Sequence, residues 1–328
     1  MVMTSFRVMK QRGYIPPRMY VKMMTGGALS LGKVLVTTRS GDLKKLRTLP
    51  KDEPHFVRPQ RKYAIPRYKT SMQCGVTNEK YLRPTLFCNP CHPDIVAMAY
   101  QLGAFQKTDY EFAQAAFAFV KEKLILEILP LDGVENTLRR GTGTCFHLIS
   151  LFIALCRAAG IKARYKMFAM NMIKAWRDAV VEVDPLVKKW YDSMGYFMIE
   201  GEGEAWIDGK WVVAHVGPTA ERQAAAGIPI TRFGEDSIGV WFFALPGTLM
   251  YLESIPYGLG GSTRFLKILA PGSMQRVNIS ILKQIEQGKR IIKNAGGIAA
   301  YDKQARLKRG PETPILDLEE KDEIVFKG

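Results

Sequence analysis

The stretch GTGTCFHLISLFIALCRAAGIKARY, residues 141–165, constrains the fold most. From Cys145 onward nearly every side chain is apolar, and a helix that is apolar all round has to be buried in a core. Gly160 follows this run and is typical of the end of a helix. The sequence therefore predicts a buried helix over 144–158 that leads directly into a strand over 161–169.

The segments on either side of this helix predict a mixed helical and antiparallel fold. Thr108 and Glu111 form a capping box ahead of an amphipathic helix, and a shorter helix is expected over 93–102. Asp208-Gly209 lies between two apolar-alternating runs, which indicates a two-residue β-hairpin. A polar helical or irregular insertion over 171–194 and a basic helix over 275–295 complete the expected elements, and the fold class is α+β.

Positive charge is concentrated at the beginning of the chain. Residues 1–83 hold 18 lysines and arginines against four acids, whereas the remaining residues hold 29 against 27. Prolines and glycines interrupt residues 1 to about 70, so we expect an extended basic arm there. Bases that alternate with aromatic residues suit an arm docked on nucleic acid or on the acidic face of a large assembly. A solvated tail and an organelle-targeting segment are the other interpretations.

These observations divide the chain into a basic arm (1–83), a globular core (84–255) and a C-terminal helical extension with a tail (256–328). No apolar run is long enough to span a membrane, and no secretory signal is evident at the start. Five unevenly spaced cysteines do not resemble a secreted disulfide framework, so we expect an intracellular protein with reduced thiols. The cytoplasm is the first expectation, and a virion or an organelle matrix stays open.

Cys145 is the candidate nucleophile on physical grounds. A thiol at the start of a helix faces free backbone N–H groups and the positive end of the helix dipole, which both favour the thiolate. The same N–H groups could stabilise an oxyanion, and Gly143 would let a substrate approach closely. The alternative is a small buried residue without chemistry, which is the interpretation for Cys156.

The order of these motifs resembles the transglutaminase-like superfamily, whose core is papain-like. The resemblance covers roughly residues 84–245 and rests on Gly141-Thr-Gly-Thr-Cys145, Arg157-Ala-Ala-Gly-Ile161, Ala163-Arg-Tyr165, Asp208-Gly-Lys-Trp211 and Pro218-Thr219. It implies a central helix packed on an antiparallel sheet, with the cysteine at the start of the helix. It also implies amide hydrolysis or acyl transfer by a cysteine, a histidine and an aspartate.

The chain departs from that family at two of the three catalytic positions. Alignment on the Asp208-Gly209 turn places Glu200 where the family has its histidine, and Gly217 where it has its aspartate. The catalytic triad of the family is therefore expected to be incomplete in this chain, unless another base replaces the histidine.

His215 is the first candidate for that replacement. If Asp208-Gly209 is the turn, Trp206 faces Trp211, Glu204 faces Val213, Glu202 faces His215 and Glu200 faces Gly217. Should this face of the hairpin point at the helix, His215 could act as base with Glu202 or Glu200 as its orienter. Glu200 as the base would need a strongly raised pKa. A buried structural role for His215 stays open.

The remaining candidates are weaker. Trp206, with Gly143, is the candidate substrate contact, although core packing against Trp211 is its other expected role. His147 lies two residues after Cys145, so on a helix its side chain points away from the thiol.

A second cluster comprises Cys74, Cys88, Cys91 and His92. It could form a zinc knuckle, and Cys88 to His92 also match the C-x-x-C-H signature of c-type haem attachment. A short structured turn with reduced cysteines is the leading interpretation, so no cofactor is expected.

Two functions remain open. The first is a catalytically degenerate binding or structural subunit that docks through residues 1–83 on nucleic acid or a large assembly. The second is an active cysteine amidase, peptidase or acyltransferase, which acts on a protein or peptide through Cys145 with His215 or Glu200 as a non-standard base.

Overall fold

The computed structural model describes residues 16–49, 51–238 and 242–308. Its helices are α2 (Arg18–Thr37), α3 (Ser40–Arg47), α4 (Pro93–Leu102), α5 (Asp109–Lys123), α6 (Val134–Arg140), α7 (Cys145–Ala158), α8 (Lys174–Val180), α9 (Pro185–Met194), α10 (Ala220–Ala225), α11 (Leu259–Leu269), α12 (Pro271–Asn294) and α13 (Ile298–Lys308). Its strands are β1 (Ile125–Leu126), β2 (Thr142–Gly143), β3 (Ala163–Met172), β4 (Phe197–Ile207), β5 (Lys210–Ala214), β6 (Phe242–Ala244) and β7 (Met250–Leu252).

The central sheet is antiparallel. Within the described ranges its order is β5-β4-β3-β6, and β7 also pairs with β3. The expected hairpin is confirmed, because Trp206 pairs with Trp211 and Glu204 with Val213 across the turn. Strands β1 and β2 form a separate parallel pair directly before α7.

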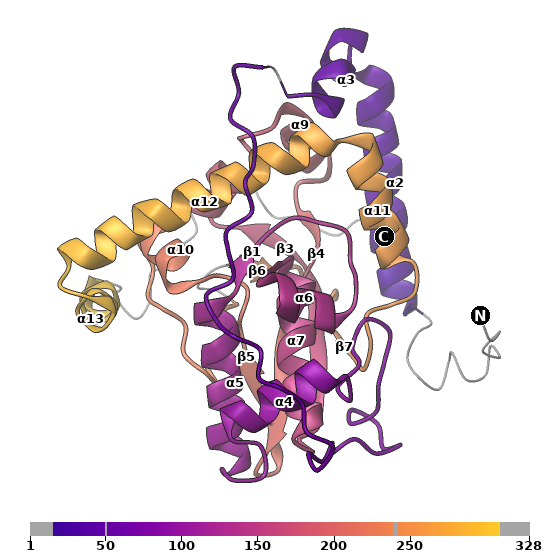
Figure 1. Ribbon diagram of the computed structural model, residues 1–328. Helices are drawn as coiled ribbons and strands as arrows, with labels where there is room; N and C mark the ends of the chain where they lie inside the picture. The colour runs from indigo at the N-terminus through magenta and orange to yellow at the C-terminus, as the bar shows by residue number, and fades with distance from the viewer. Residues whose placement is uncertain (1–15, 50, 239–241, 309–328) are drawn as a thin grey trace.

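Helix α7 packs on this sheet and carries the largest part of the core (Figure 1). Two glycines of β4 allow the close approach: a Cβ on Gly203 would lie 2.7 Å from the ring of Phe152, and one on Gly201 would lie 3.5 Å from the ring of Phe146. The helix predicted over 144–158 and the α+β fold with a helix on an antiparallel sheet are both confirmed. The G-x-G pattern of β4 thus fixes which face of the sheet α7 covers.

Further helices surround this unit. Helices α4, α5 and α6 pack around α7, and the long helix α12 crosses the molecule at the end where α7 begins (Figure 1). Helix α10 lies against α12, where a Cβ on Gly288 would overlap the carbonyl of Glu221. The basic helix predicted over 275–295 is confirmed as α12. Helices α8 and α9 fill the insertion expected over 171–194.

The N-terminal segment is not the extended arm that was predicted. Residues 18–47 form two helices, and Tyr20, Met23, Gly27, Leu31 and Val34 bury one stripe of α2. Their spacing of three or four residues is helical, and Gly27 lies within the stripe as a residue without a side chain. Gly27 therefore belongs to the buried face, whereas its neighbour Gly26 is exposed.

Residues 51–83 run without helix or strand along the outside of the core (Figure 1). The hydroxyl of Tyr63 donates to the carbonyl of Leu138 at 2.6 Å, and its ring packs edge-on against Phe119. Tyr20 and Tyr63, which were expected to stack on a partner, therefore contact the chain's own core. Residues 1–15, with Tyr14, and the acidic tail 309–328 lie outside the described residues.

The predicted boundaries at 84 and 256 stay predictions. None of the helices in the described ranges is long and apolar enough to cross a bilayer.

Candidate active site

Cys145 begins α7, as predicted, and its thiol lies against the free N–H groups of the first turn. The residue keeps intermediate exposure, yet its sulfur is enclosed. Burial, followed by the nearby Glu200 carboxylate, raises the pKa of the Cys145 thiol well above its usual value, although the N–H groups of Phe146 and Cys145 oppose this. The resting sulfur is therefore a protonated thiol.

Glu200 lines the same cavity as this thiol, and its charge acts on the thiol. Burial raises the pKa of Glu200 to about 7, against hydrogen bonds from the Gly201 N–H and from the Cys145 thiol that lower it. A carboxyl group with such a pKa can accept and release a proton near neutral pH. The tuning by burial that the sequence argument required for Glu200 is thus present.

His215 faces the same space from the end of β5. A Cβ placed on Gly217 would lie 3.8 Å from Nε2 of His215 and 4.0 Å from Cβ of Cys145. The imidazole and Cys145 therefore both lie next to Gly217. The imidazole packs edge-on against Phe242, and its Nδ1 has no hydrogen-bond partner among the described residues. Burial, and then the charges of Lys121, Arg222 and Lys166, lower the pKa of His215 well below its usual value. His215 is therefore neutral, and it is a weaker base than Glu200 in this setting.

The sequence argument did not identify Arg222, a fully buried residue of α10 that also borders the site. Its Nε donates to Oε1 of Gln284 at 3.2 Å, and its charge interacts with Glu200 and Cys145. Burial lowers the pKa of Arg222 to about 10, so the guanidinium is still positive at neutral pH. The sequence around it, Glu221-Arg222-Gln223, gave no signal of burial, because charged and polar residues flank the arginine.

A second buried cation supports the loop beside the thiol. Lys121 of α5 donates to the carbonyl of Pro218 at 2.8 Å and to Oε1 of Gln223 at 2.9 Å. Burial, and then the charge of Arg222, lower the pKa of Lys121 to about 7. Lys121 thus holds the Gly217-Pro218 segment that separates Cys145 from His215.

These groups enclose a cavity of about 60 Å³. Its lining consists of Leu126, Ile128, Cys145, Met172, Trp176, Val180, Phe197, Glu200, His215, Gly217, Pro218 and Arg222. A space of this size is large enough to admit water. Helix α8 supplies Trp176 and Val180, so this insertion covers one side of the site.

Other predicted site residues lie elsewhere. Glu202 and Glu204 are not among the residues that line the cavity, and Glu204 pairs with Arg164 at 2.5 Å. Glu202 pairs with Lys166 at 2.9 Å and accepts from Ser237, so the expected orientation of His215 by Glu202 is not formed. Trp206 packs against Trp211 and does not line the cavity, and Gly143 makes room for His147 rather than for a substrate.

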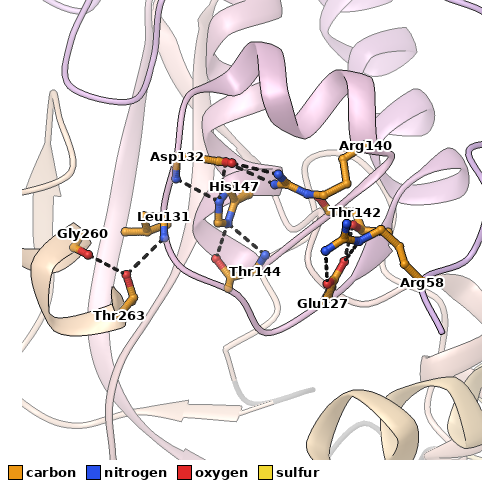
Figure 2. A network of polar contacts seen from close by, with 10 residues as sticks. All are labelled: Arg58, Glu127, Leu131, Asp132, Arg140, Thr142, Thr144, His147, Gly260 and Thr263. Atoms are coloured by element: carbon orange, nitrogen blue, oxygen red, sulfur yellow. Dashed lines mark hydrogen bonds and ion pairs between the residues drawn. The ribbon is translucent and has the colours of Figure 1, made fainter. Parts of the chain in front are cut away.

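His147 points away from Cys145, as predicted, and takes part in the polar network shown in Figure 2. Its Nδ1 accepts from the N–H of Thr144 at 3.0 Å, and its Nε2 lies 3.0 Å from the carboxylate of Asp132. Arg140 binds the same carboxylate through two nitrogens, at 2.8 and 3.2 Å. Partial burial raises the pKa of Asp132, but the hydrogen bonds from His147 and Arg140 outweigh it and lower that pKa to about 2. This network fixes the start of α7, and with it the position of Cys145.

The other half of Figure 2 ties the N-terminal segment to the strand pair before α7. Arg58 donates from Nε and Nη2 to the two oxygens of the buried Glu127, each at 2.7 Å. Thr142 also hydrogen-bonds this carboxylate. Residues 51–83 are thereby fastened beside the active-site helix.

The cysteine cluster does not form the metal site considered above. Cys74 and Cys91 form a disulfide with a Cα–Cα distance of 5.8 Å, so the expectation of reduced thiols is wrong for this pair. Cys88 is buried with its sulfur 3.7 Å from the carbonyl of Ser150, and His92 caps α4. No three metal-ligating side chains converge anywhere in the described ranges, and the disulfide occupies one of the two thiols that haem attachment requires.

Comparison with known proteins agrees with this geometry. The family model of the transglutaminase-like superfamily matches residues 96–215, a span that includes Cys145, Glu200 and His215. Residues 96–215 are therefore similar to the core of this superfamily.

Among solved structures, a likeness is found to a protein described as a putative cysteine protease from Cytophaga hutchinsonii. It shares 19% sequence identity with a TM-score of 0.31, and covers 42% of this chain and 40% of that protein. This likeness spans less than half of either chain and indicates nothing about activity here. No curated protein matches the sequence.

Proposed function

We propose that the transglutaminase-like core is a thiol-dependent amide hydrolase or acyltransferase, with Cys145 as the nucleophile and Glu200 as its base. One observation carries this proposal: the thiol at the start of α7 lines the same cavity as Glu200, a carboxyl group whose pKa burial has raised to about 7. We therefore prefer an active enzyme to a catalytically degenerate binding or structural subunit. Protein or peptide amides are the proposed substrates.

In the proposed first step, Glu200 removes the proton from the thiol while the sulfur attacks an amide carbonyl. The electrons of the C=O bond move to the oxygen, and the free N–H groups of the first turn of α7 stabilise the oxyanion. The C–N bond then breaks, and Glu200 returns the proton to the departing amine. Water or a second amine attacks the thioester, again with Glu200 as the base, and Cys145 regains its proton.

Arg222 is proposed to stabilise the negative charge that moves between Glu200 and Cys145. Its charge interacts with both groups, and burial strengthens that interaction because little water screens it. The thiolate of a cysteine protease is usually paired with an imidazolium ion, which the lowered pKa of His215 disfavours here. A permanent cation can fill this role without a proton.

Substrate entry requires movement of α8. The cavity of about 60 Å³ is too small for a peptide, and Trp176 and Val180 close it on one side. Helix α8 is short and is attached to α12 by a hydrogen bond from Gln284 to the carbonyl of Ala175, at 3.3 Å. Its displacement would open the thiol to an extended chain.

Acylation by p-nitrophenyl acetate tests the proposal, since formation of the thioester releases coloured nitrophenolate. Mass spectrometry should place the acetyl group on Cys145 and not on Cys156, which is buried in the same helix. Glu200→Gln should slow acylation at least about 100-fold, as expected for the loss of a general base. His215→Ala should retain more activity than Glu200→Gln. Acylation of Cys145 at an unchanged rate in Glu200→Gln would contradict the assignment of the base.

A binding role for the cationic N-terminal segment is the second candidate function. Lys62, Arg67 and Lys69 are exposed along the outside of the core, beside the exposed ring of Tyr68, and none of these three bases pairs with a carboxylate among the described residues. Nucleic acid or an acidic assembly would match this charge. Binding of a single-stranded oligonucleotide that weakens steeply with salt, and that is lost in the triple glutamate variant of these bases, would support this role.

A further inference from the structure

Two neighbouring helices, α2 and α11, expose apolar and basic side chains together. Their sequences, RMYVKMMTGGALSLGKVLVT and LGGSTRFLKIL, contain no acidic residue. Leu266 and Leu269 of α11 pack against the same small apolar cluster that contains Leu31 and Val34 of α2, and the two helices overlap in the view of Figure 1. The two helices therefore form one part of the surface.

Large apolar side chains on this surface remain in solvent. Leu29 and Val36 of α2 are 72% and 88% exposed, and Phe265 and Ile268 of α11 are 56% and 68% exposed. On α2 the exposed residues recur at helical spacing, opposite the stripe that contacts the core. None of these four exposed side chains belongs to the apolar cluster between the two helices.

The charges on these helices all have the same sign. Arg18 and Lys33 of α2, and Arg264 and Lys267 of α11, are exposed and pair with no carboxylate among the described residues. Exposed apolar residues between unpaired lysines and arginines are typical of helices that lie in a membrane interface. Each such base contributes to attraction by an anionic lipid surface.

We propose that α2 and α11 form a docking surface for an anionic membrane, on which both helices lie flat without spanning it. Charge complementarity carries the choice of partner. A second copy of this chain bound through the same surface would bring the two sets of bases against each other. A nucleic acid would match the charge but leave the aliphatic side chains of Leu29, Val36 and Ile268 without a partner.

Co-sedimentation of the full chain with lipid vesicles tests this. Vesicles of phosphatidylcholine with about one third phosphatidylserine should bind the protein at about 0.1 M salt, and pure phosphatidylcholine vesicles should bind it at least about tenfold more weakly. The variants Leu29→Glu and Ile268→Glu should each reduce binding about tenfold. They should fold normally, because both side chains are exposed in the wild type.

Leu307→Glu on α13 is the matched control, since Leu307 is 76% exposed on another helix and should bind like the wild type. Lys33→Glu with Lys267→Glu should weaken binding, whereas Lys303→Glu on α13 should not. Equal binding to both kinds of vesicle, no binding to either, or an equal effect of the α13 controls would overturn the proposal. A dimer in light scattering that Leu29→Glu dissociates would also overturn it, because the surface would then join two copies of the chain.

Discussion

Replacement of Glu200 by glutamine should make the protein more stable at neutral and alkaline pH. The ordinary pKa of a glutamate is 4.5, and burial raises that of Glu200 to about 7. Between these values the folded state holds a proton that the unfolded state has released, so the stability of the wild type falls as the pH rises. Below pH 4.5 the carboxyl is neutral in both states and does not lower the stability of the folded state. Above about pH 7 the folded protein carries a buried negative charge, which lowers its stability.

The size of this effect follows from the two pKa values. Their difference corresponds to about 3 kcal/mol in the free energy of unfolding, at about 1.4 kcal/mol for each pH unit. A glutamine has nearly the same shape and does not titrate. The difference in unfolding free energy between Glu200→Gln and the wild type should therefore grow by about 2.5 kcal/mol from pH 5 to pH 8, in favour of the variant.

Urea denaturation followed by tryptophan fluorescence at four pH values between 5 and 8 would measure this difference. Glu122→Gln, which removes an exposed carboxylate from α5, is the control for the loss of one acidic group. In a Cys145→Ala background the pH at which the difference levels off should move upward, because the Cys145 thiol lowers the pKa of Glu200 in the folded state. A difference that does not vary with pH would refute the electrostatic description of the site.

Three further changes test the fold around it. Gly203→Ala would place a Cβ 2.7 Å from the ring of Phe152, so urea denaturation should show a loss of about 1–3 kcal/mol. Replacement of Cys74 and Cys91 by serine removes a cross-link between residues 17 apart, and should cost about 2–4 kcal/mol by the same measurement; reduction of the wild type should have a similar effect. Lys121→Met should change the free energy of unfolding more favourably at pH 7 than at pH 10. Burial lowers the pKa of Lys121 to about 7, so the wild type becomes more stable between these pH values, where the folded protein no longer carries the buried charge. A pH-independent effect of Lys121→Met would contradict this assignment.

The sequence predicted those features that depend on neighbouring residues. The turn at Asp208-Gly209 fixes the pairing of Trp206 with Trp211, because a two-residue hairpin leaves one register. Helix α7 was predictable because its apolar run is bounded by Gly160 and begins at Cys145. Which face of the hairpin meets α7 was not predictable. It depends on Gly201 and Gly203, and glycines do not contribute to a pattern of alternating hydrophobic side chains.

Features that depend on distant contacts were missed. Arg222 lies far along the chain from Cys145, and only the folding of α10 onto α12 brings it to the cavity. The pairing of Cys74 with Cys91 likewise depends on the path of residues 51–83 across the core, which no local pattern specifies. Helix α2 was not predicted because Gly27 has no apolar side chain and so hides the stripe of buried residues to which it belongs. Its position nevertheless fits the helical spacing of that stripe.

A glutamate base at position 200, in place of a histidine, changes which group carries charge in the proposed mechanism. In a cysteine–histidine pair the base becomes a cation when it takes the thiol proton, and that cation stabilises the thiolate. Glu200 becomes neutral when it takes the proton, so it cannot stabilise the thiolate in this way. Arg222 supplies a positive charge that does not depend on proton transfer, and the replacement of histidine by glutamate at this position is chemically workable only together with such a buried cation. Arg222→Met should therefore slow acylation of Cys145 even when Glu200 is intact, and acylation at the wild-type rate in a folded Arg222→Met variant would show that the two residues are not coupled.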